Sequence, residues 1–384
     1  MADKPLTHQT EVFRIKEIFK HENADKMEIL KIYGFTCCVG KGQFKVGDLA
    51  AFIQPDSIVP PTDDYNFLRS ESDGDDFPVR RRRIKVRRLR GVISQGLVVA
   101  APDGSKEGDD VSDILQITHY DPEVHSGFAA KGMGGEQDIP PDGYNPEYDI
   151  DTNFNRYGFL LQEGEEIVCT EKVHGSNVRF KFSKEKNKFY CGSHRRWLRG
   201  TMKEQIFFKN SFWEKLKFRL SVLFGKSKVS LRKGKNVWWD TLIAYPNVAK
   251  FIRDNPDCVI YGEVYGPIQK GYHYGSKEDV RFFAFDILRG NEFVGWDESQ
   301  EIANDYQIPW VPLRYRGPYS EVMLRDLAEK DSIASTLEGG VQEGLVIKPI
   351  PERTELRIGR VQLKLISNRY YESKDCQFGD KVDN

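Results

Sequence analysis

Residues 170–177 read Thr-Glu-Lys-Val-His-Gly-Ser-Asn and lie between two strand-like runs, 167–170 and 178–182. Lys172 therefore has a strand–loop–strand setting, and the following Gly175 lets a backbone approach a ligand closely. This is the local pattern that a covalent lysine nucleophile requires. By itself the pattern is weak, because a lysine in a turn is usually only a solvated lysine. Its interpretation depends on the motifs further along the chain.

Four further motifs come after this loop in order. They read Ile-Tyr-Gly-Glu at 260–263, Phe-Phe-Ala-Phe-Asp-Ile at 282–287, Glu-Gly-Leu-Val-Ile-Lys at 343–348 and Val-Gln-Leu-Lys at 361–364. Taken singly, Glu263 and Glu343 would be surface carboxylates at strand ends, and Phe285 would be a core residue. Five motifs in one order are far more specific. The set resembles the covalent nucleotidyltransferases, the superfamily of nucleic-acid ligases and mRNA capping enzymes.

The histidine at position 174 narrows this resemblance. DNA ligases and capping enzymes usually carry Asp at this place, whereas Lys-x-His-Gly-x-Asn is similar to the motif of RNA ligases. The leading hypothesis is therefore an ATP-dependent RNA ligase that joins RNA ends carrying a 3'-hydroxyl and a 5'-phosphate. A capping guanylyltransferase, a DNA ligase and a catalytically inactive tRNA- or RNA-binding protein remain as alternatives.

The resemblance implies a mechanism in three steps. Lys172 attacks the α-phosphorus of ATP, releases pyrophosphate and forms a lysyl-AMP phosphoramidate. The AMP then passes to an RNA 5'-phosphate, and a 3'-hydroxyl displaces it. A free lysine is almost fully protonated at neutral pH. Nearby cations are therefore expected to help Lys172 lose its proton: Mg²⁺ or Mn²⁺, Lys348 and Lys364.

The resemblance also assigns roles to individual residues. Catalysis is expected of Lys172, His174, Lys348 and Lys364. Nucleotide binding is expected of Glu171, Lys172, Val173, Asn177, Arg195, Glu263, Phe285, Lys348 and Lys364. In this assignment Phe285 stacks on adenine and Glu263 binds the ribose hydroxyls. The metal is expected on Glu343, directly or through water, and on Glu263 as the second ligand.

Two positions depart from the pattern of the family. Gln362 stands where the last motif often has its first lysine, so Lys364 alone keeps the charge there. This substitution is the one hint of an inactive relative, against which Lys172, Glu263 and Glu343 are all present. The phosphate-facing arginine is assigned to Arg195, with Arg196 as the alternative.

The amino-terminal part has a different pattern. Short apolar runs separated by Gly and Asp turns recur about every ten residues up to about residue 115, which predicts a small β-barrel. An SH3-like barrel fits these signals about as well as an OB fold does. Residues 21–29, His-Glu-Asn-Ala-Asp-Lys-Met-Glu-Ile, and 90–97 resemble the OB-type module at the front of one RNA ligase subfamily.

These patterns predict an α+β architecture with two domains. We expect an OB-like barrel at 1–120, a linker at 121–150 and the nucleotidyltransferase domain at 151–384. Helices are expected at 204–224, 240–254 and 320–330. Because every nucleotide motif lies after residue 150, the barrel is expected to be a separable module.

Composition limits the remaining possibilities. The 384 residues are 39% hydrophobic and 30% charged, which is a globular composition. No apolar stretch is long enough for a membrane span, and the amino terminus lacks the apolar core of a secretory signal. The six cysteines show no CxxC spacing, which argues against a zinc site or a disulfide framework. We expect a soluble, cytoplasmic monomer.

Charge is balanced in total, at -1, but is unevenly distributed. An acid-rich segment, 62–76, is followed by residues 80–90, in which eight of eleven positions are Arg or Lys. This basic run could be a solvated strand paired with the acidic segment, or a localisation signal. Contact with phosphates of RNA is the favoured interpretation, because the run precedes the expected ligase domain.

Overall fold

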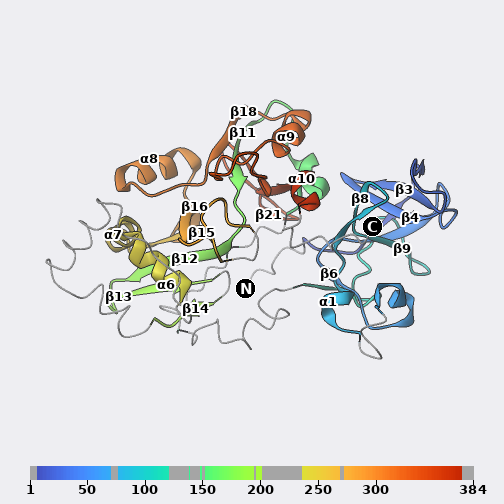
Figure 1. The fold of residues 1–384 in the computed structure, drawn as a ribbon, viewed down its shortest axis with the longest axis horizontal. Helices are drawn as coiled ribbons and strands as arrows, with labels where there is room; N and C mark the ends of the chain where they lie inside the picture. Colours follow the sequence, from blue (N-terminus) through green and yellow to red (C-terminus); the bar gives the residue numbers. More distant parts are fainter. Residues whose placement is uncertain are drawn as a thin grey trace. The chain divides into compact units, whose positions relative to one another are not determined.

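The computed structural model describes residues 7–70, 77–120, 138, 148, 152–193, 196–200, 236–268 and 272–373. The chain divides into two compact units (Figure 1). The first unit consists of residues 1–127, 151–162 and 353–384, and the second of residues 128–150 and 163–352. Within the described residues, no helix is both long and apolar enough to cross a membrane.

Two segments expected in the second domain, 151–162 and 353–384, group with the first unit. The expected domain bounds therefore stay a prediction. The expected linker, 121–150, lies outside the described residues except for Asp138 and Tyr148. The expected helix at 204–224 also lies outside them.

The first unit is built on short antiparallel strands around several apolar clusters. One sheet has the order β1-β5-β9, with β1 at Glu11–Arg14, β5 at Leu49–Ile53 and β9 at Leu97–Ala100. A second sheet has the order β2-β3-β4, with bounds Phe19–Lys20, Met27–Ile32 and Phe35–Gly40. Leu30, Phe35 and Phe52 from the two sheets pack together in the core. In β4 buried side chains alternate with more exposed ones, whereas β5 is buried at four consecutive positions.

The other elements of the first unit are short. They are β6 (Ser57–Ile58), η1 (Asp63–Leu68), α1 (Val79–Arg82), β7 (Val86–Leu89), β8 (Val92–Gln95), β10 (Thr118–His119), α3 (Phe154–Tyr157), η4 (Gly158–Leu160), β20 (Thr354–Glu355), β21 (Gly359–Arg360), β22 (Leu363–Ile366) and α10 (Asn368–Glu372). β7 and β8 form a hairpin whose turn holds Arg90 and Gly91 at positive φ.

The second unit contains a six-stranded antiparallel sheet of order β14-β13-β12-β15-β16-β17. The bounds are β12 (Ser176–Ser183), β13 (Lys188–Gly192), β14 (Trp197–Leu198), β15 (Cys258–Tyr265), β16 (Arg281–Arg289) and β17 (Glu292–Phe293). Helices α6 (Val237–Ala244), α7 (Pro246–Asp254) and α8 (Trp296–Tyr306) accompany this sheet (Figure 1). Trp239 and Phe251 from the helices pack against Phe180 and Phe282 from the sheet.

A second antiparallel group of strands carries the lysine loop. In this group β11 (Glu166–Lys172) lies between β18 (Leu313–Pro318) and β19 (Gly344–Pro349). The expected strands at 167–170 and 178–182 are parts of β11 and β12, and the expected helix at 320–330 is α9 (Glu321–Ala328). The expected helix at 240–254 is instead two helices, because Pro246 begins α7 and restricts the residue before it.

A substitution at Gly262 in β15 can test how tightly the main sheet is packed. A Cβ atom at Gly262 would collide with the ring of Phe282 and the carbonyl of Phe283. We expect Gly262→Ala to lower the free energy of unfolding by about 1–3 kcal/mol, the usual cost of overpacking a core. Denaturant unfolding followed by tryptophan fluorescence measures this, because Trp238 and Trp239 lie in the same core.

The matched control is Gly40→Ala, at the end of β4. There the added methyl group would meet the movable amide end of Gln43, at 3.2 Å from Oε1. Equal destabilisation by the two substitutions would show that loss of glycine, and not collision in the sheet, is responsible.

Candidate functional site

Lys172 is the last residue of β11 and is held by an ion pair across the neighbouring strand. The register of β11 and β19 places Lys172 opposite Gly344, so that Glu343 lies beside it. The Nζ atom of Lys172 is 2.7 Å from Oε1 of Glu343. The lysine side chain is 27% exposed and the glutamate side chain 3%, so the amine can be reached from solvent while its partner cannot.

Glu343 is buried against two basic side chains. The Nδ1 atom of His174 lies 3.6 Å from the second carboxylate oxygen, Oε2. Burial alone would raise the pKa of Glu343, but Lys172 and His174 outweigh it and lower this pKa to about 2. Glu343 is therefore ionised throughout the neutral range.

The position of His174 is fixed by two tyrosines. Its backbone N–H donates a hydrogen bond to the hydroxyl of Tyr274 at 2.7 Å. Its ring packs edge-on against Tyr272, with centroids 5.2 Å apart. Neither tyrosine is part of a motif recognised from sequence, because their contacts with His174 arise only in the folded chain. His174 is thus the buried neighbour of Glu343 and not a solvated turn residue.

Glu263 is brought to the lysine loop by the pairing of β12 with β15, which sets it opposite Asn177. A side chain at Gly175 would collide with the carbonyl of Val264 and come within 2.9 Å of Cγ of Glu263, so this position requires glycine. Burial raises the pKa of Glu263 to about 8, although Lys172 lowers it, and the charge of Glu343 raises it further. Lys172 therefore lies near two carboxyl groups, one with a lowered pKa and one with a raised pKa.

A β-bulge on β16 decides which side chains of the aromatic motif face the site. Tyr261 pairs with Asp286 and Gly262 with Ala284, so Phe285 is the extra residue. Phe282, Ala284 and Ile287 pack in the helix-side core, while Phe285 packs in the clusters of the opposite face. The bulge shifts the alternation by one residue, which puts Asp286 on the face of Phe285.

Asp286 holds Lys348. The Nζ atom of Lys348 is 2.8 Å from each carboxylate oxygen of Asp286, and the hydroxyl of Tyr148 donates to the same carboxylate. All three side chains are buried, and the ring of Tyr148 lies 4.8 Å from that of Phe285. Neither Asp286 nor Tyr148 has a role among those expected from the sequence. The place of Asp286 within the aromatic motif was a usable signal, whereas nothing in the sequence indicated Tyr148.

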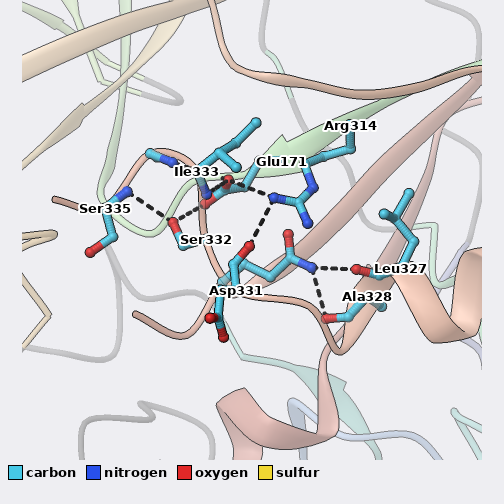
Figure 2. A network of polar contacts seen from close by, with 10 residues as sticks. Glu171, Arg314, Leu327, Ala328, Asp331, Ser332, Ile333 and Ser335 are labelled. Atoms are coloured by element: carbon cyan, nitrogen blue, oxygen red, sulfur yellow. Dashed lines mark hydrogen bonds and ion pairs between the residues drawn. The ribbon is translucent and has the colours of Figure 1, made fainter. Parts of the chain in front are cut away.

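Glu171, next to the lysine, is fully engaged within the protein (Figure 2). Its carboxylate accepts hydrogen bonds from the Ser332 hydroxyl and from the backbone N–H groups of Ile333, at 2.9 Å, and Ala334, at 3.2 Å. Arg314 lies 3.8 Å away and donates to the carbonyl of Asp331 at 2.8 Å. Burial raises the pKa of Glu171, and these donors oppose that rise. Successive strand side chains point to opposite faces, so this carboxylate faces away from the Lys172 amine.

The remaining expected site residues are divided between the two units and the part of the chain outside the described residues. Val173 is buried in an apolar cluster with Tyr265 and Tyr274. Asn177 is on β12, and its Oδ1 atom is buried without a hydrogen-bond partner among the described residues. Lys364 and Gln362 belong to the first unit, with Lys364 on β22. Arg195 lies outside the described residues.

The donor set around Lys172 fits a hard divalent cation. Oε2 of Glu343 and Oδ1 of Asn177 are buried oxygen atoms without a hydrogen-bond partner in the described part of the chain. No group of three or more His, Cys, Asp or Glu side chains in those ranges could hold a metal by itself. Mg²⁺ is usually bound by one or two carboxylates together with water and substrate phosphates, so three such ligands are not needed.

Comparison with known proteins identifies the family. A model of the RNA ligase family matches residues 165–366, and a model of an OB-fold domain matches residues 10–101. Because the first match covers more than half of the chain, this protein belongs to the RNA ligase family, whose members join RNA ends. Its amino-terminal barrel is an OB fold, and the SH3-like alternative is not supported.

Solved structures agree on the fold. A variant RNA ligase from Naegleria gruberi, bound to ATP and Mn, is 19% identical, with a TM-score of 0.70 over 96% of this chain and 99% of that chain. Another variant of that ligase, bound to AMP and Mn, is 20% identical, with a TM-score of 0.71 over the same shares. The same ligase with PPi is 20% identical, with a TM-score of 0.70 over 95% and 98%. A search of curated protein sequences finds no match.

The two site carboxylates should give stability opposite pH dependences. Glu343, with its lowered pKa, stabilises the fold above its unfolded-state pKa, and this contribution is lost as the pH falls towards about 2. Glu263, with its raised pKa, stabilises the fold below its unfolded-state pKa of ~4.3. That contribution is lost as the pH rises to about 8.

We therefore expect the unfolding free energy of the wild type to fall relative to Glu263→Gln between about pH 5 and 8, by up to ~1.4 kcal/mol per pH unit. Denaturant titrations at several pH values measure this difference. The exposed Glu185, changed to Gln, should leave the profile unaltered. A difference between wild type and Glu263→Gln that does not vary with pH would contradict the assignment.

Proposed function

We propose that this protein is an ATP-dependent RNA ligase that seals 3'-hydroxyl to 5'-phosphate RNA ends through a lysyl-AMP intermediate. The observation that carries the proposal is a reachable Lys172 amine, 2.7 Å from the buried carboxylate of Glu343, within an RNA ligase domain. The ATP, AMP and pyrophosphate named with the Naegleria ligase structures support the same nucleotide for this chain.

In the first step Lys172 forms an N–P bond to the α-phosphorus of ATP. The bond from that phosphorus to the bridging oxygen breaks, pyrophosphate leaves, and the amine loses its proton. A protonated amine offers no lone pair, so Lys172 must give its proton to solvent and leave Glu343 before it attacks. Since the pKa of Glu343 is about 2, Glu343 is a poor proton acceptor. We assign Glu343 to holding and aiming Lys172 in the free enzyme.

Other residues of the site bind the nucleotide. Lys348, fixed by Asp286, supplies a positive charge that stabilises the developing charge on the α-phosphate. Phe285 stacks on adenine, and Glu263 binds the ribose hydroxyls. Glu171 and Val173 contribute through their backbones. Further contacts are assigned to His174, Asn177, Arg195 and Lys364.

Mg²⁺ or Mn²⁺ held by Glu343 and Glu263 would supply charge that neutralises the phosphate oxygens. In the second step the RNA 5'-phosphate attacks the phosphorus of the lysyl-AMP, and Lys172 is released. In the third step the 3'-hydroxyl attacks the 5'-phosphate and AMP leaves. No protein nucleophile is needed for sealing, so this chain's residues mainly align the two ends. We propose that it acts as a monomer.

The decisive test is self-labelling. Incubated with α-labelled ATP and Mg²⁺, the wild type should retain label after denaturation, and Lys172→Ala should retain none, because the nucleophile is missing. Lys250→Ala is the matched control: it removes an exposed lysine on α7 that is paired with Asp254. Label from GTP in preference to ATP would indicate a capping enzyme. Label that survives in Lys172→Ala would refute the assignment of the nucleophile.

The basic run at 80–90 divides into internal and exposed arginines. Arg82 donates to the carbonyls of Phe77, at 2.9 Å, and Val59, at 3.0 Å. Arg83 pairs with Asp56 at 2.8 Å and stacks on the ring of Tyr120. These two side chains hold the loops of the first unit together. Arg80, Arg88 and Arg90 are exposed, so they are the members of the run that we propose for RNA.

We expect Arg80, Arg88 and Arg90, all changed to Ala, to weaken binding to every RNA sequence alike. Neutralised phosphates release counterions, so three lost contacts should flatten the slope of log affinity against log salt by about 2. Binding at several salt concentrations measures this, and self-labelling should stay intact. Arg83→Ala is the control, which should destabilise the first unit and leave the salt slope unaltered. An unchanged slope in the triple variant would mean that these arginines do not contact RNA.

A further inference from the structure

A short segment of the first unit, residues 152–157, connects the OB barrel to the strand that carries Lys364. Within this segment Asn153 caps α3: its side chain accepts a hydrogen bond from the Asn155 N–H at 2.9 Å. Residues 152–157 contain none of the nucleotide motifs. Their contacts nevertheless reach both the barrel and the last motif.

On the barrel side the contact is built around Arg156. Its guanidinium group pairs with Glu11 on β1 and lies over the ring of Tyr33, 3.9 Å from the centroid. The Tyr33 hydroxyl donates to the other oxygen of Glu11 at 2.5 Å, so the three side chains form a closed set. The Arg156 side chain is only 13% exposed, and that of Glu11 20%. A pair at this burial is screened much less than a surface ion pair.

Two further hydrogen bonds hold the same segment to the barrel. The Gly34 N–H donates to the carbonyl of Asn155 at 2.7 Å. The Tyr157 hydroxyl donates to the carbonyl of Thr7 at 3.1 Å. Together with Arg156 they give α3 a defined position on the barrel.

On the other side the segment is bonded to the last motif. The Lys364 N–H donates to the carbonyl of Thr152 at 2.9 Å, and the Thr152 hydroxyl donates to the carbonyl of Gln362. Asn153 also forms a parallel β-bridge with Lys364. Thr152 therefore lies between the motif residue and Arg156, four positions further on. A displacement of α3 would be transmitted to the backbone of Lys364.

We infer that Arg156 is a positioning residue for Lys364, and that the OB barrel acts on nucleotide transfer through it. The inference rests on the proposed role of Lys364 in ATP chemistry. It assigns the barrel a second contribution besides RNA binding: contacts at Glu11 and Tyr33 set the backbone from which Lys364 extends. It also means that a chain starting near residue 150 would lack the partners of Arg156 and Tyr157, so the barrel is not simply separable.

The test is the rate of self-labelling with α-labelled ATP in the full-length chain, measured over a range of ATP concentrations. Arg156→Ala should lower the rate at saturating ATP by about ten- to a hundredfold, the scale of a misplaced catalytic group. Lys364→Ala should also be slow. If Arg156 acts through Lys364, adding Arg156→Ala to Lys364→Ala should change the rate by less than about twofold.

Arg14→Ala is the matched control. Arg14 lies on the same strand as Glu11, and its ion pair with Glu107 is about half exposed at both ends. Its loss should leave the rate unchanged. Glu11→Gln and Tyr33→Phe repeat the test with smaller changes, so an unstable Arg156→Ala would not end it. Both should slow labelling in the wild type and leave Lys364→Ala unaffected.

The outcomes separate the inference from the proposed function. Absence of AMP label on the wild type would refute the proposed function. A wild-type rate in Arg156→Ala, or an equal loss with and without Lys364, would overturn the inference while the function stands. A wild-type rate in Lys364→Ala would remove the role of that lysine and overturn the inference with it.

Discussion

The ion pair between Lys172 and Glu343 is the interaction on which the site depends. The two residues are 171 positions apart and meet because β11 pairs with β19. The residue before each of them is anchored to one segment. Glu171 accepts hydrogen bonds from Ser332 and Ile333, and Gln342 donates to the carbonyls of Leu327 and Ala328 at 2.6 and 2.9 Å. The segment from the end of α9 onward therefore binds the residue before each member of the pair; Figure 2 shows its contacts with Glu171. Removing one partner of a buried ion pair leaves the other charge buried without compensation, which is strongly destabilising. The contacts of Glu171 and Gln342 keep the two strands, and therefore the pair, in place.

The electrostatics of the free enzyme suit a site that binds ATP. Glu343 is ionised beside Lys172 and His174, whereas burial keeps Glu263 largely protonated below about pH 8. Two carboxylates near one lysine cannot both carry charge without further cations. A divalent cation held here together with the nucleotide would supply such charge. Opposed pKa shifts of this kind are typical of sites that move protons.

The two other site lysines, Lys348 and Lys364, are each positioned by a residue outside the loop that carries Lys172. Lys348 is fixed by Asp286, which the bulge on β16 turns towards it. Lys364 is fixed through Thr152, whose neighbours are bonded to the OB barrel. Arg82 and Arg83 hold loops of the first unit, so the proposed contact with RNA is limited to the other members of the basic run. Charge on a sequence is thus divided between structure and binding by local packing.

The sequence by itself determined the fold class, the family and the order of the motifs, because these depend on local patterns: strand alternation, glycine spacing and residue types next to one another. Tertiary structure decided the rest. The bulge at Phe285, the partners of Glu171 and the bond from Lys364 to Thr152 join positions far apart in the chain, and no local pattern encodes such pairings. The helix break at Pro246 could have been predicted, because a proline is a local signal. The roles of Tyr148 and Arg156 could not, because their partners lie far away in the sequence.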